Sequence, residues 1–570
     1  AVLTQSSTVL KAKRSFFVSL LRRSIHRQSL ADGKKTHFHI LKQGLDQDLH
    51  VSNLLLQMYG NCGALHDAEK FFQHMEQKDL YSWRFLIRAY VKDGHKDKAL
   101  SFFFEMLGRG FFPDNPVICT IISACYGKQG IYVARVIHAF IAECVLNPSV
   151  SVYTSLLSTY GKYGFLIDAN SVFSQLIERD VVCWNAMISS YVSKEENMKA
   201  IGVFYEMNID GIQPDRSSFL SVLTACASQK SLIEGMLVHV CIIEGVFEDD
   251  VGVANALVNM YGNCDSLEDA QSVFNKISAM DVVSWNAMIA GFVRNDQDKE
   301  ALLLFGKMQM NGVVPSNVTF IAILSGLSSS STLDQGKMIH HFIVCNECDQ
   351  DIVIENSLVS MYGKCGGVND AKTVFDKSNC RDRVSWTAML TAYTQGGRGE
   401  HAMALFGQMQ HEGLVPDRVT FISLTMAFTC DSMLYKGKQT HARILSCGFV
   451  NDLALENGLV TMYGKCGSVE YAKTTFQKMR RRDLLSWNAV ISACVQNEVS
   501  DDALKLVNKM VNEGIFPDKF LCSSVMSACA SAGAQERGKE MHFFAVINSY
   551  ELDQAVGNAT INMYAKFGSV

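Results

Sequence analysis

An internal repeat of 101 residues constrains this chain more than any other feature of its sequence. All five tryptophans of the chain keep this spacing, at Trp83, Trp184, Trp285, Trp386 and Trp487. The same step separates tyrosines from Tyr59 to Tyr564 and histidines from His37 to His542. A fixed period without insertions or deletions is typical of a repeat architecture rather than of one globular core.

Each period divides into three related units, for example residues 282–316, 317–351 and 352–382, which are 35, 35 and 31 residues long. A unit has an apolar first segment, such as 285–292, a polar break, and a second segment, such as 299–308. Gly312 and Pro315 then close the unit. The pattern predicts two short helices per unit. Small residues recur where the two helices would touch: Ala99, Ala200, Ala301, Ala402 and Ala503 in one unit type, and Ala68, Ala169, Ala270, Ala371 and Ala472 in another.

A helical hairpin of this size cannot bury its own apolar face, so neighbouring hairpins must stack. We therefore expect an all-α fold, a right-handed α-solenoid with a continuous core and a concave surface. Residues 14–570 form the array, with sixteen complete units up to residue 553 and a truncated unit at 554–570. Residues 1–13 are a separate N-terminal segment, for which disorder is an alternative.

The first 31 residues lack Asp and Glu and are rich in Arg, Lys and Ser, which is typical of a transit peptide. From Arg14 onward, however, they align with later units, and we assign them to the array. Because no initiator Met is present, we expect a fragment of a longer protein.

Composition excludes several classes of protein. The net charge of −5 and the pI near 6.3 lack the basic excess of a duplex-DNA binder, so a nucleic-acid site would be a local groove. The 18 cysteines are not spaced like a secreted disulfide scaffold, which favours a reducing compartment. The sequence contains no uninterrupted apolar run of about 20 residues, so no membrane-spanning helix is predicted.

Cysteine and histidine, which can bind metals or act in catalysis, give no sign of either role in this sequence. Cys345 and Cys348 form a lone CxxC without a second pair, so we predict no metal site and no cofactor. The periodic cysteines and histidines indicate packing, each His contacting the next unit. The tryptophans are predicted packing anchors. No Pro-Cys-x-x-Cys motif of a zinc deaminase is present, so no enzyme is predicted in this chain.

Three strings identify a resemblance: residues 282–289 (VVSWNAMI), 361–366 (MYGKCG) and 413–417 (GLVPD). They resemble the consensus of pentatricopeptide repeats, and the 35, 35, 31 triplet resembles the PLS subclass of plant organellar RNA-binding and editing factors. Tetratricopeptide repeats are the alternative, but they have a 34-residue period and a Trp-x-x-Leu-Gly pattern, both absent here.

The resemblance implies that each repeat reads one base of single-stranded RNA through its fifth and last residues. Short amides and hydroxyls can donate to and accept from a base edge, and an acidic partner can orient them. Asn with Asp implies uracil, Thr with Asp guanine, and Asn with Ser cytosine. The pairs for uracil are Asn53 with Asp79, Asn185 with Asp215, Asn255 with Asp281, Asn356 with Asp382, Asn457 with Asp483 and Asn488 with Asp518; those for guanine are Thr154 with Asp180 and Thr387 with Asp417; Asn286 with Ser316 implies cytosine, and Asn558 alone a pyrimidine.

Some units do not fit this scheme. The His-bearing units of 35 residues carry Cys119, Leu220, Ile321 and Ile422 at the fifth position, and these side chains cannot hydrogen-bond a base usefully. We predict that these units are spacers. Arg84 with Asp114 fits no known pairing, and Ser523 with Asp553 lies in a unit type that usually does not read.

Two further positions are predicted to contact the RNA. The second residue of a unit would wedge between successive bases, as in Val182, Val283, Val384 and Leu485. Lysines at the end of a first helix could meet phosphates, with a solvated helix end as the equal alternative; they are Lys162, Lys364, Lys465 and Lys566.

The predicted target, read 5′ to 3′ along the chain, is U-n-n-G-U-n-U-C-n-U-G-n-U-U-n-Y. The resemblance implies a recognition module for C-to-U RNA editing in the mitochondrion or chloroplast, with single-stranded RNA and other editing proteins as partners, and no membrane or small-molecule substrate. An RNA-stabilising or processing factor that acts by occupancy is the alternative in the same class. A peptide-binding helical scaffold is the alternative in another class.

Overall fold

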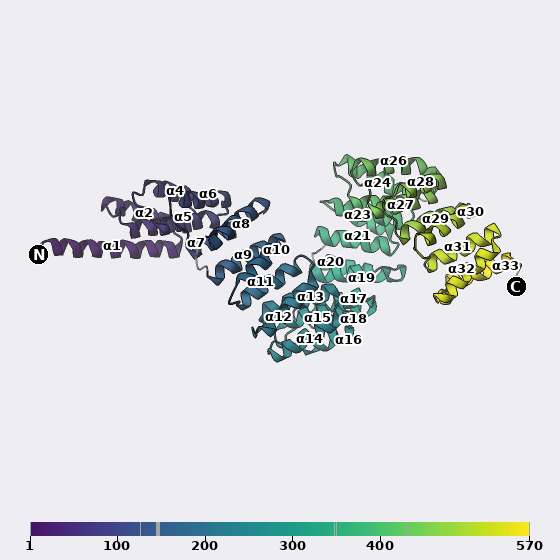
Figure 1. Cartoon of the computed structure of the whole chain (residues 1–570), viewed down its shortest axis with the longest axis horizontal. Coiled ribbons are helices and arrows are strands. Elements are labelled where there is room, and N and C mark those ends of the chain that lie inside the picture. Colours follow the sequence, from purple (N-terminus) through teal and green to yellow (C-terminus); the bar gives the residue numbers. More distant parts are fainter. Residues whose placement is uncertain are drawn as a thin grey trace. The chain divides into compact units, whose positions relative to one another are not determined.

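Helices form the regular structure of the chain in the computed structural model (Figure 1). The structure describes residues 2–125, 127–143, 149–346, 348, 350–428 and 430–568, with only the backbone at 2–12, 127–129, 142–143 and 431. Within these ranges there is no strand, and none of the helices is long and apolar enough to cross a membrane.

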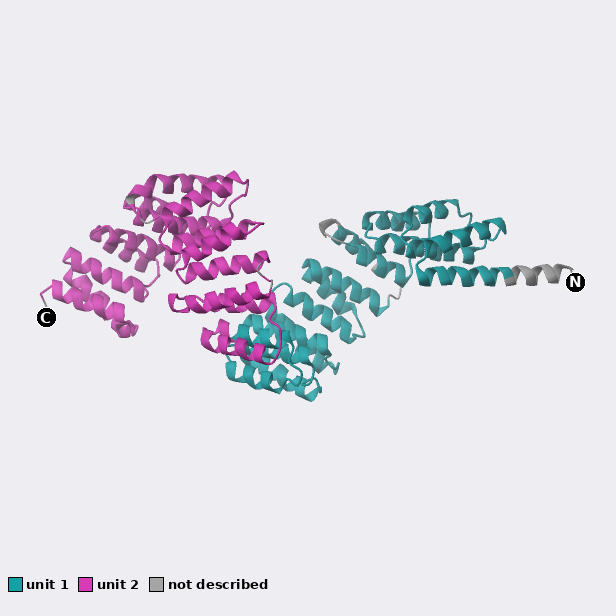
Figure 2. Ribbon diagram, turned by 180° about the vertical axis from the view of Figure 1, so that it is seen from behind, with its two compact units in different colours: residues 1–291 teal, residues 292–570 magenta. Residues whose placement is uncertain are grey.

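The chain divides into two compact units, residues 1–291 and 292–570, which we call the N-terminal and C-terminal bodies (Figure 2). The helices of the N-terminal body are α1 Val2–Arg27, α2 Leu30–Lys42, α3 Leu49–Asn61, α4 Leu65–His74, α5 Leu80–Lys92, α6 Lys96–Gly108, α7 Asn115–Ala124, α8 Gly127–Glu143, α9 Val150–Tyr163, α10 Leu166–Gln175, α11 Val181–Val192, α12 Asn197–Ile209, α13 Arg216–Gln229, α14 Leu232–Glu244, α15 Val251–Asn263 and α16 Leu267–Lys276. The division falls inside α17 Val282–Arg294.

The C-terminal body continues the same alternation of helices. Its helices are α18 Asp298–Met310, α19 Asn317–Gly326, α20 Leu333–Cys345, α21 Ile352–Lys364, α22 Val368–Lys377, α23 Arg383–Gln395, α24 Gly399–His411, α25 Arg418–Ala427, α26 Leu434–Ser446, α27 Leu453–Lys465, α28 Val469–Lys478, α29 Leu484–Gln496, α30 Ser500–Asn512, α31 Lys519–Ala532, α32 Gln535–Ile547 and α33 Gln554–Lys566, with short 3₁₀ turns at η1 Ser330–Thr332, η2 Asp431–Met433 and η3 Tyr550–Leu552.

Helix boundaries follow from local chemistry. Most first helices begin directly after an aspartate whose carboxylate accepts the N–H of the third helical residue, as Asp483 does from Ser486 at the start of α29. The Ser486 hydroxyl completes a capping box. Many second helices end at a glycine with positive φ, such as Gly413 (φ 78°) after α24, followed by Pro416.

The two helices of each hairpin pack through the predicted small residues. Ala402 and Ala503 are buried in the 35-residue units, and Ala371 and Ala472 in the 31-residue units. The 31-residue units are shorter because their second helices have 10 residues, as in α22, whereas α24 has 13. The prediction of an all-α solenoid of stacked hairpins is therefore confirmed within each body.

Two details differ from the prediction. The helices are longer than the apolar segments, since α17 begins at Val282 and α18 ends at Met310. Capping rather than the apolar pattern sets these ends, since α17 begins directly after Asp281, whose carboxylate accepts the backbone N–H of Ser284. Residues 2–13, which we set apart from the array, are helical and continuous with the rest of α1.

Candidate nucleic-acid interface

Six of the predicted reading pairs, all with Asn at the fifth position, are joined by a direct hydrogen bond. The amide nitrogen of Asn donates to the carboxylate that ends its unit. The N···O distances are 3.0 Å for Asn53–Asp79, 2.9 Å for Asn185–Asp215, 3.4 Å for Asn255–Asp281, 3.4 Å for Asn356–Asp382, 3.2 Å for Asn457–Asp483 and 3.1 Å for Asn488–Asp518.

Each of these aspartates is also the residue before the next first helix, so its position is fixed by helix capping. Asp483 accepts the backbone N–H of Ser486 at 2.8 Å and the Ser486 hydroxyl at 2.7 Å. Partial burial alone would raise the pKa of Asp483, but the hydrogen bonds from Ser486 and Asn457 hold this pKa below its ordinary value. Asp483 is therefore ionised at neutral pH and acts as an acceptor.

The side-chain oxygen of the fifth-position Asn is in two different states. In Asn53 and Asn185 it accepts the hydroxyl of Ser82 at 2.7 Å and of Ser218 at 2.6 Å. In three other units the buried Oδ1 has no hydrogen-bond partner in the part of the chain that the structure describes; these are Asn255, Asn457 and Asn488. A buried acceptor without a donor is unfavourable by about 1–3 kcal/mol.

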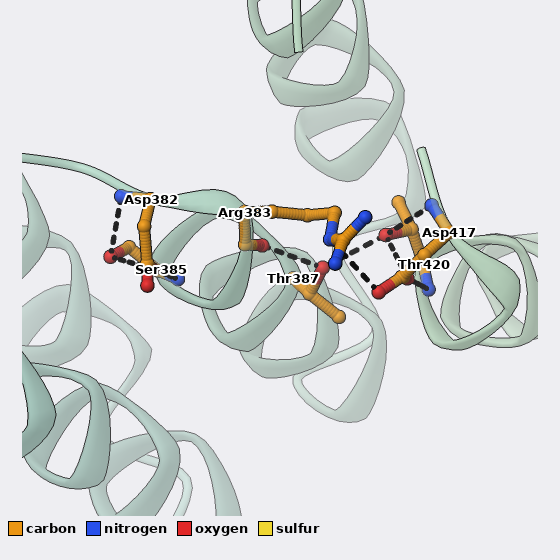
Figure 3. Close-up of polar contacts among 6 residues, drawn as sticks. All are labelled: Asp382, Arg383, Ser385, Thr387, Asp417 and Thr420. Carbon is orange, nitrogen blue, oxygen red and sulfur yellow. Dashed lines mark hydrogen bonds and ion pairs between the residues drawn. The ribbon is translucent and has the colours of Figure 1, made fainter. Parts of the chain in front are cut away.

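The two Thr–Asp pairs are not in direct contact. The Thr387 hydroxyl lies 2.9 Å from the Thr420 hydroxyl, which in turn donates to Asp417 at 2.8 Å (Figure 3). The Thr154 hydroxyl donates to the carbonyl of Val150, four residues back in its own helix. Guanine reading by these pairs therefore remains a prediction that the unbound geometry does not test.

Three predicted reading residues remain. Asn286 and Ser316 belong to different bodies, so their pairing also stays a prediction. Asn558 is exposed on α33.

The second-position residues are exposed apolar side chains, as stacking requires. Val182, Val283, Val384 and Leu485 are between 53% and 64% exposed although each lies in the first turn of a helix in a buried hairpin. Five further residues at the predicted second position, not named individually in the sequence analysis, are also exposed: Tyr81, Val318, Val353, Val419 and Phe520. Val318 and Val419 belong to units predicted to be spacers.

The four lysines in one register are exposed in the last turn of α9, α21, α27 and α33. None of Lys162, Lys364, Lys465 and Lys566 forms an ion pair with another described residue. Free cations at this place can meet phosphates, although a cation at a helix C-terminus is also favoured by the helix dipole.

Grooves bring these positions together. One groove of about 580 Å³ in the C-terminal body is lined by Asn457, Asp483 and Asn488 together with Leu485 and Lys465. One groove thus holds residues of all three predicted kinds, for the base edge, the base face and the phosphate.

The N-terminal body has two comparable grooves. One of about 510 Å³ is lined by Thr154, Asp180, Val182 and Lys162. Another of about 610 Å³ contains Asn53 and Asp79.

The other periodic residues have packing roles, as predicted. Trp487 is buried and meets the ring of Phe476 edge-on at 4.7 Å between centroids. His441 hydrogen-bonds the Tyr463 hydroxyl of the next unit at 2.9 Å, and the other five periodic histidines make the same contact at 2.6–3.5 Å. No group of three or more metal-ligating side chains occurs among the described residues.

Comparison with known protein families identifies the repeat. The family model described as "PPR repeat family" matches residues 179–228, 280–329, 381–428 and 482–531, and the model "PPR repeat" matches 51–80, 81–111, 151–181, 253–282, 356–380 and 457–484. Together these models cover more than half of the chain. The chain belongs to the pentatricopeptide repeat family.

Similar proteins and structures carry the same family name. A pentatricopeptide repeat-containing protein of Arabidopsis thaliana is 33% identical over 94% of this chain and 78% of its own length. A second, named mitochondrial, is 29% identical over 94% of this chain and 70% of its own length. The crystal structure of the pentatricopeptide repeat protein PPR10 from maize has a TM-score of 0.65 at 18% identity, covering 97% of this chain and 86% of that one. This likeness supports the helical solenoid fold.

Proposed function

We propose that this pentatricopeptide repeat array binds single-stranded RNA in a sequence-specific manner, one base per repeat. The observation that carries the proposal is the groove lined by Asn457, Asp483, Asn488, Leu485 and Lys465. Amide and carboxylate can hydrogen-bond a base edge, the aliphatic side chain can stack on a base, and the lysine can neutralise a phosphate.

The unpaired oxygens support recognition of uracil in particular. Uracil offers an N–H donor beside carbonyl acceptors on its free edge. The Oδ1 atoms of Asn255, Asn457 and Asn488 lack a donor in the unbound protein. A base N–H would supply it after a small rotation of the amide, so binding would relieve an unfavourable state of the free protein.

The proposed target is U-n-n-G-U-n-U-C-n-U-G-n-U-U-n-Y. Its test is binding of the purified chain to this RNA and to a scrambled RNA of equal composition, at physiological salt. We expect a clear preference for the designed sequence, because each well-placed contact discriminates by about 1–3 kcal/mol per base, by analogy with DNA readout. Equal affinities for the two RNAs would contradict the proposal.

A single substitution tests the reading positions more sharply. Asn356→Thr should shift the preference opposite its unit from uracil to guanine, because it recreates the Thr–Asp pair of the unit 383–417. Affinities for four RNAs that differ only at that base measure the shift. An equal loss for all four RNAs would instead indicate misfolding or a purely structural Asn356.

We further propose that the array is of the PLS type and gives a plant organellar RNA editing factor its target site for C-to-U conversion, in the mitochondrion or chloroplast. The mitochondrial name of one relative supports an organelle. The chemistry would come from another domain or partner, because the array has no predicted catalytic residues. Editing of the matching transcript site in plants that lack the protein separates this role from RNA stabilisation, since a stabilising factor would change transcript abundance and leave editing intact.

A further inference from the structure

The last-position aspartates show a regularity that extends beyond the reading pairs. Nearly every one of them is contacted by a side-chain nitrogen of its own unit, through a hydrogen bond or an ion pair, and this donor group lies at either of two positions. In seven units it is the fifth residue: the six asparagines above and Arg84, whose guanidinium lies 3.7 Å from Asp114. In six others it is the first residue: Arg14 to Asp48 at 3.2 Å, Arg216 to Asp250 at 3.0 Å, Asn317 to Asp351 at 2.8 Å, Arg383 to Asp417 at 3.2 Å, Arg418 to Asp452 at 2.6 Å and Lys519 to Asp553 at 3.1 Å.

The two kinds of donor exclude each other. Every unit with an asparagine at the fifth position that reaches its aspartate has an aliphatic first residue: Leu49, Val181, Val251, Ile352, Leu453 or Leu484. Every unit with a polar first-position donor lacks an amide at the fifth position, where it has Val18, Leu220, Ile321, Thr387, Ile422 or Ser523. The first and fifth residues are i and i+4 on one helix, so they share a face and reach the same carboxylate.

The unit 383–417 combines a first-position donor with a predicted reading pair. Figure 3 shows Arg383 extending past Thr387 to Asp417. Nε of Arg383 lies 3.2 Å from one carboxylate oxygen, and the other oxygen accepts the backbone N–H of Thr420 at 2.9 Å and its hydroxyl at 2.8 Å. Arg383 is still 54% exposed. Its remaining N–H groups are available next to the reading position.

The ion pair of Arg383 and Asp417 is suited to contact a base rather than a phosphate. The ion pair is neutral overall, so a phosphate would have to displace Asp417 to reach Arg383. Lys465, in the same body, has no such carboxylate partner among the described residues and is the better candidate for a phosphate contact. A guanidinium only donates, and guanine presents an O6 acceptor where adenine presents an amino donor. Asp417 can in turn accept from the N–H groups of guanine.

We propose that Arg383 is a third specificity-determining residue of the unit 383–417 and donates to guanine beside Thr387 and Asp417. This inference rests on the proposed RNA binding. By the same geometry, the first-position cations Arg216, Arg418 and Lys519 would give the units predicted to be spacers a donor that faces the RNA.

The chain contains a matched comparison. The unit 150–180 has the same Thr–Asp pair, Thr154 with Asp180, but its first residue is Val150. Asp180 accepts the backbone N–H of Cys183 at 2.9 Å, and the Thr154 hydroxyl donates to the carbonyl of Val150. The two units share the Thr–Asp pair and differ in the first residue. They also differ in length, 31 against 35 residues, and in the third residue of the next unit, Cys183 against Thr420, so each variant is compared with the wild type at its own unit.

The experiment is a swap in the full chain. Affinities are measured for RNAs that carry guanine or adenine opposite each of the two units, in the wild type, Arg383→Leu and Val150→Arg. Leucine is native at this position in other units, so Arg383→Leu should fold. We expect it to lose about tenfold in guanine-over-adenine preference opposite 383–417 only. Val150→Arg should gain a similar factor opposite 150–180, a gain that misfolding cannot produce.

Three outcomes would overturn the inference. If the guanine-over-adenine preference is unchanged in both variants, Arg383 only holds Asp417 in place and does not contact the base. An equal loss for all RNAs, with a salt slope smaller by about 0.7, would mark a phosphate contact. If the wild type binds the designed and scrambled RNAs equally, the proposed function itself fails and the inference falls with it, a pattern distinct from the first two.

Discussion

At the scale of single residues, the last-position aspartate serves two purposes at once. Asp483 caps α29 through the backbone N–H of Ser486 and also holds the amide of Asn457. Helix capping thus fixes the carboxylate before any RNA arrives, which reduces the entropy lost on binding. Under the proposed RNA binding, the same residue would serve both stability and base reading.

Two substitutions at this residue separate the two roles. Asp483→Ala should lower the free energy of unfolding by about 1 kcal/mol, because the N-cap acceptor is lost. Asp483→Asn should change it by only a few tenths of a kcal/mol, since Asn is an equally good N-cap. Both should weaken the uracil preference opposite that unit. Urea unfolding and RNA binding measure the two effects; equal stability of both variants would show that capping by Asp483 contributes nothing.

At the scale of helices, close contacts between successive first helices set the spacing of the reading positions. A Cβ on Gly464 of α27 would lie 2.5 Å from the Cβ of Ala493 on α29, and one on Gly363 of α21 would lie 2.7 Å from that of Ala392 on α23. Such distances require glycine, because the helices touch without intervening side chains.

A pair of glycine substitutions tests this contact. Gly464→Ala should lower the free energy of unfolding by about 1–3 kcal/mol through overpacking. Gly407→Ala is the matched control: Gly407 lies inside α24 with nothing within 4 Å of an added Cβ, so the change should raise stability by about 0.5–1 kcal/mol. Thermal or urea unfolding measures both, and a stabilising Gly464→Ala would contradict the close contact.

At the scale of the whole molecule, one His–Tyr hydrogen bond recurs between units along both bodies. Burial lowers the pKa of His37, His239 and His441 below 6.5. Burial likewise raises the pKa of the partner Tyr463 to about 12. The contacts of His37, His239 and His441 are therefore made by a neutral imidazole and a neutral phenol at neutral pH.

This repetition predicts acid sensitivity. Above pH 6.5 these histidines are neutral in both the folded and unfolded states. Below it the unfolded chain binds protons that the folded chain does not, so stability is lost as the pH falls from 6.5 towards the depressed folded pKa values. The urea midpoint should fall between pH 7.5 and 5.5. His441→Gln should reduce this fall, whereas His411→Gln, at an exposed position, should not; the same fall in both variants would contradict the assignment.

Much of the arrangement was predictable because it is local and periodic. The period of 101 residues, the two helices per unit and the buried tryptophans follow from residue types at fixed spacing, and so does a contact of each periodic His with the next unit. The structure identified the tyrosine as its partner. The pairing of Asn53 with Asp79 also followed from the repeat register, through the family resemblance. A repeated sequence displays its own register, so no long-range contact had to be deduced.

Only the tertiary structure revealed that first-position side chains hold the aspartates of the units without a fifth-position Asn or Arg donor. Arg383 and Thr387 share one helix face, and either could reach Asp417, about 30 residues further along the chain. The sequence shows that some units have an aliphatic and others a cationic first residue, but it does not show that the cationic ones contact the last-position aspartate. The sequence by itself determined the repeat, the hairpins and the reading register. The folding of each unit decided which aspartates are held by a first-position side chain instead, because that contact joins residues more than 30 positions apart and no local pattern contains the distance between them.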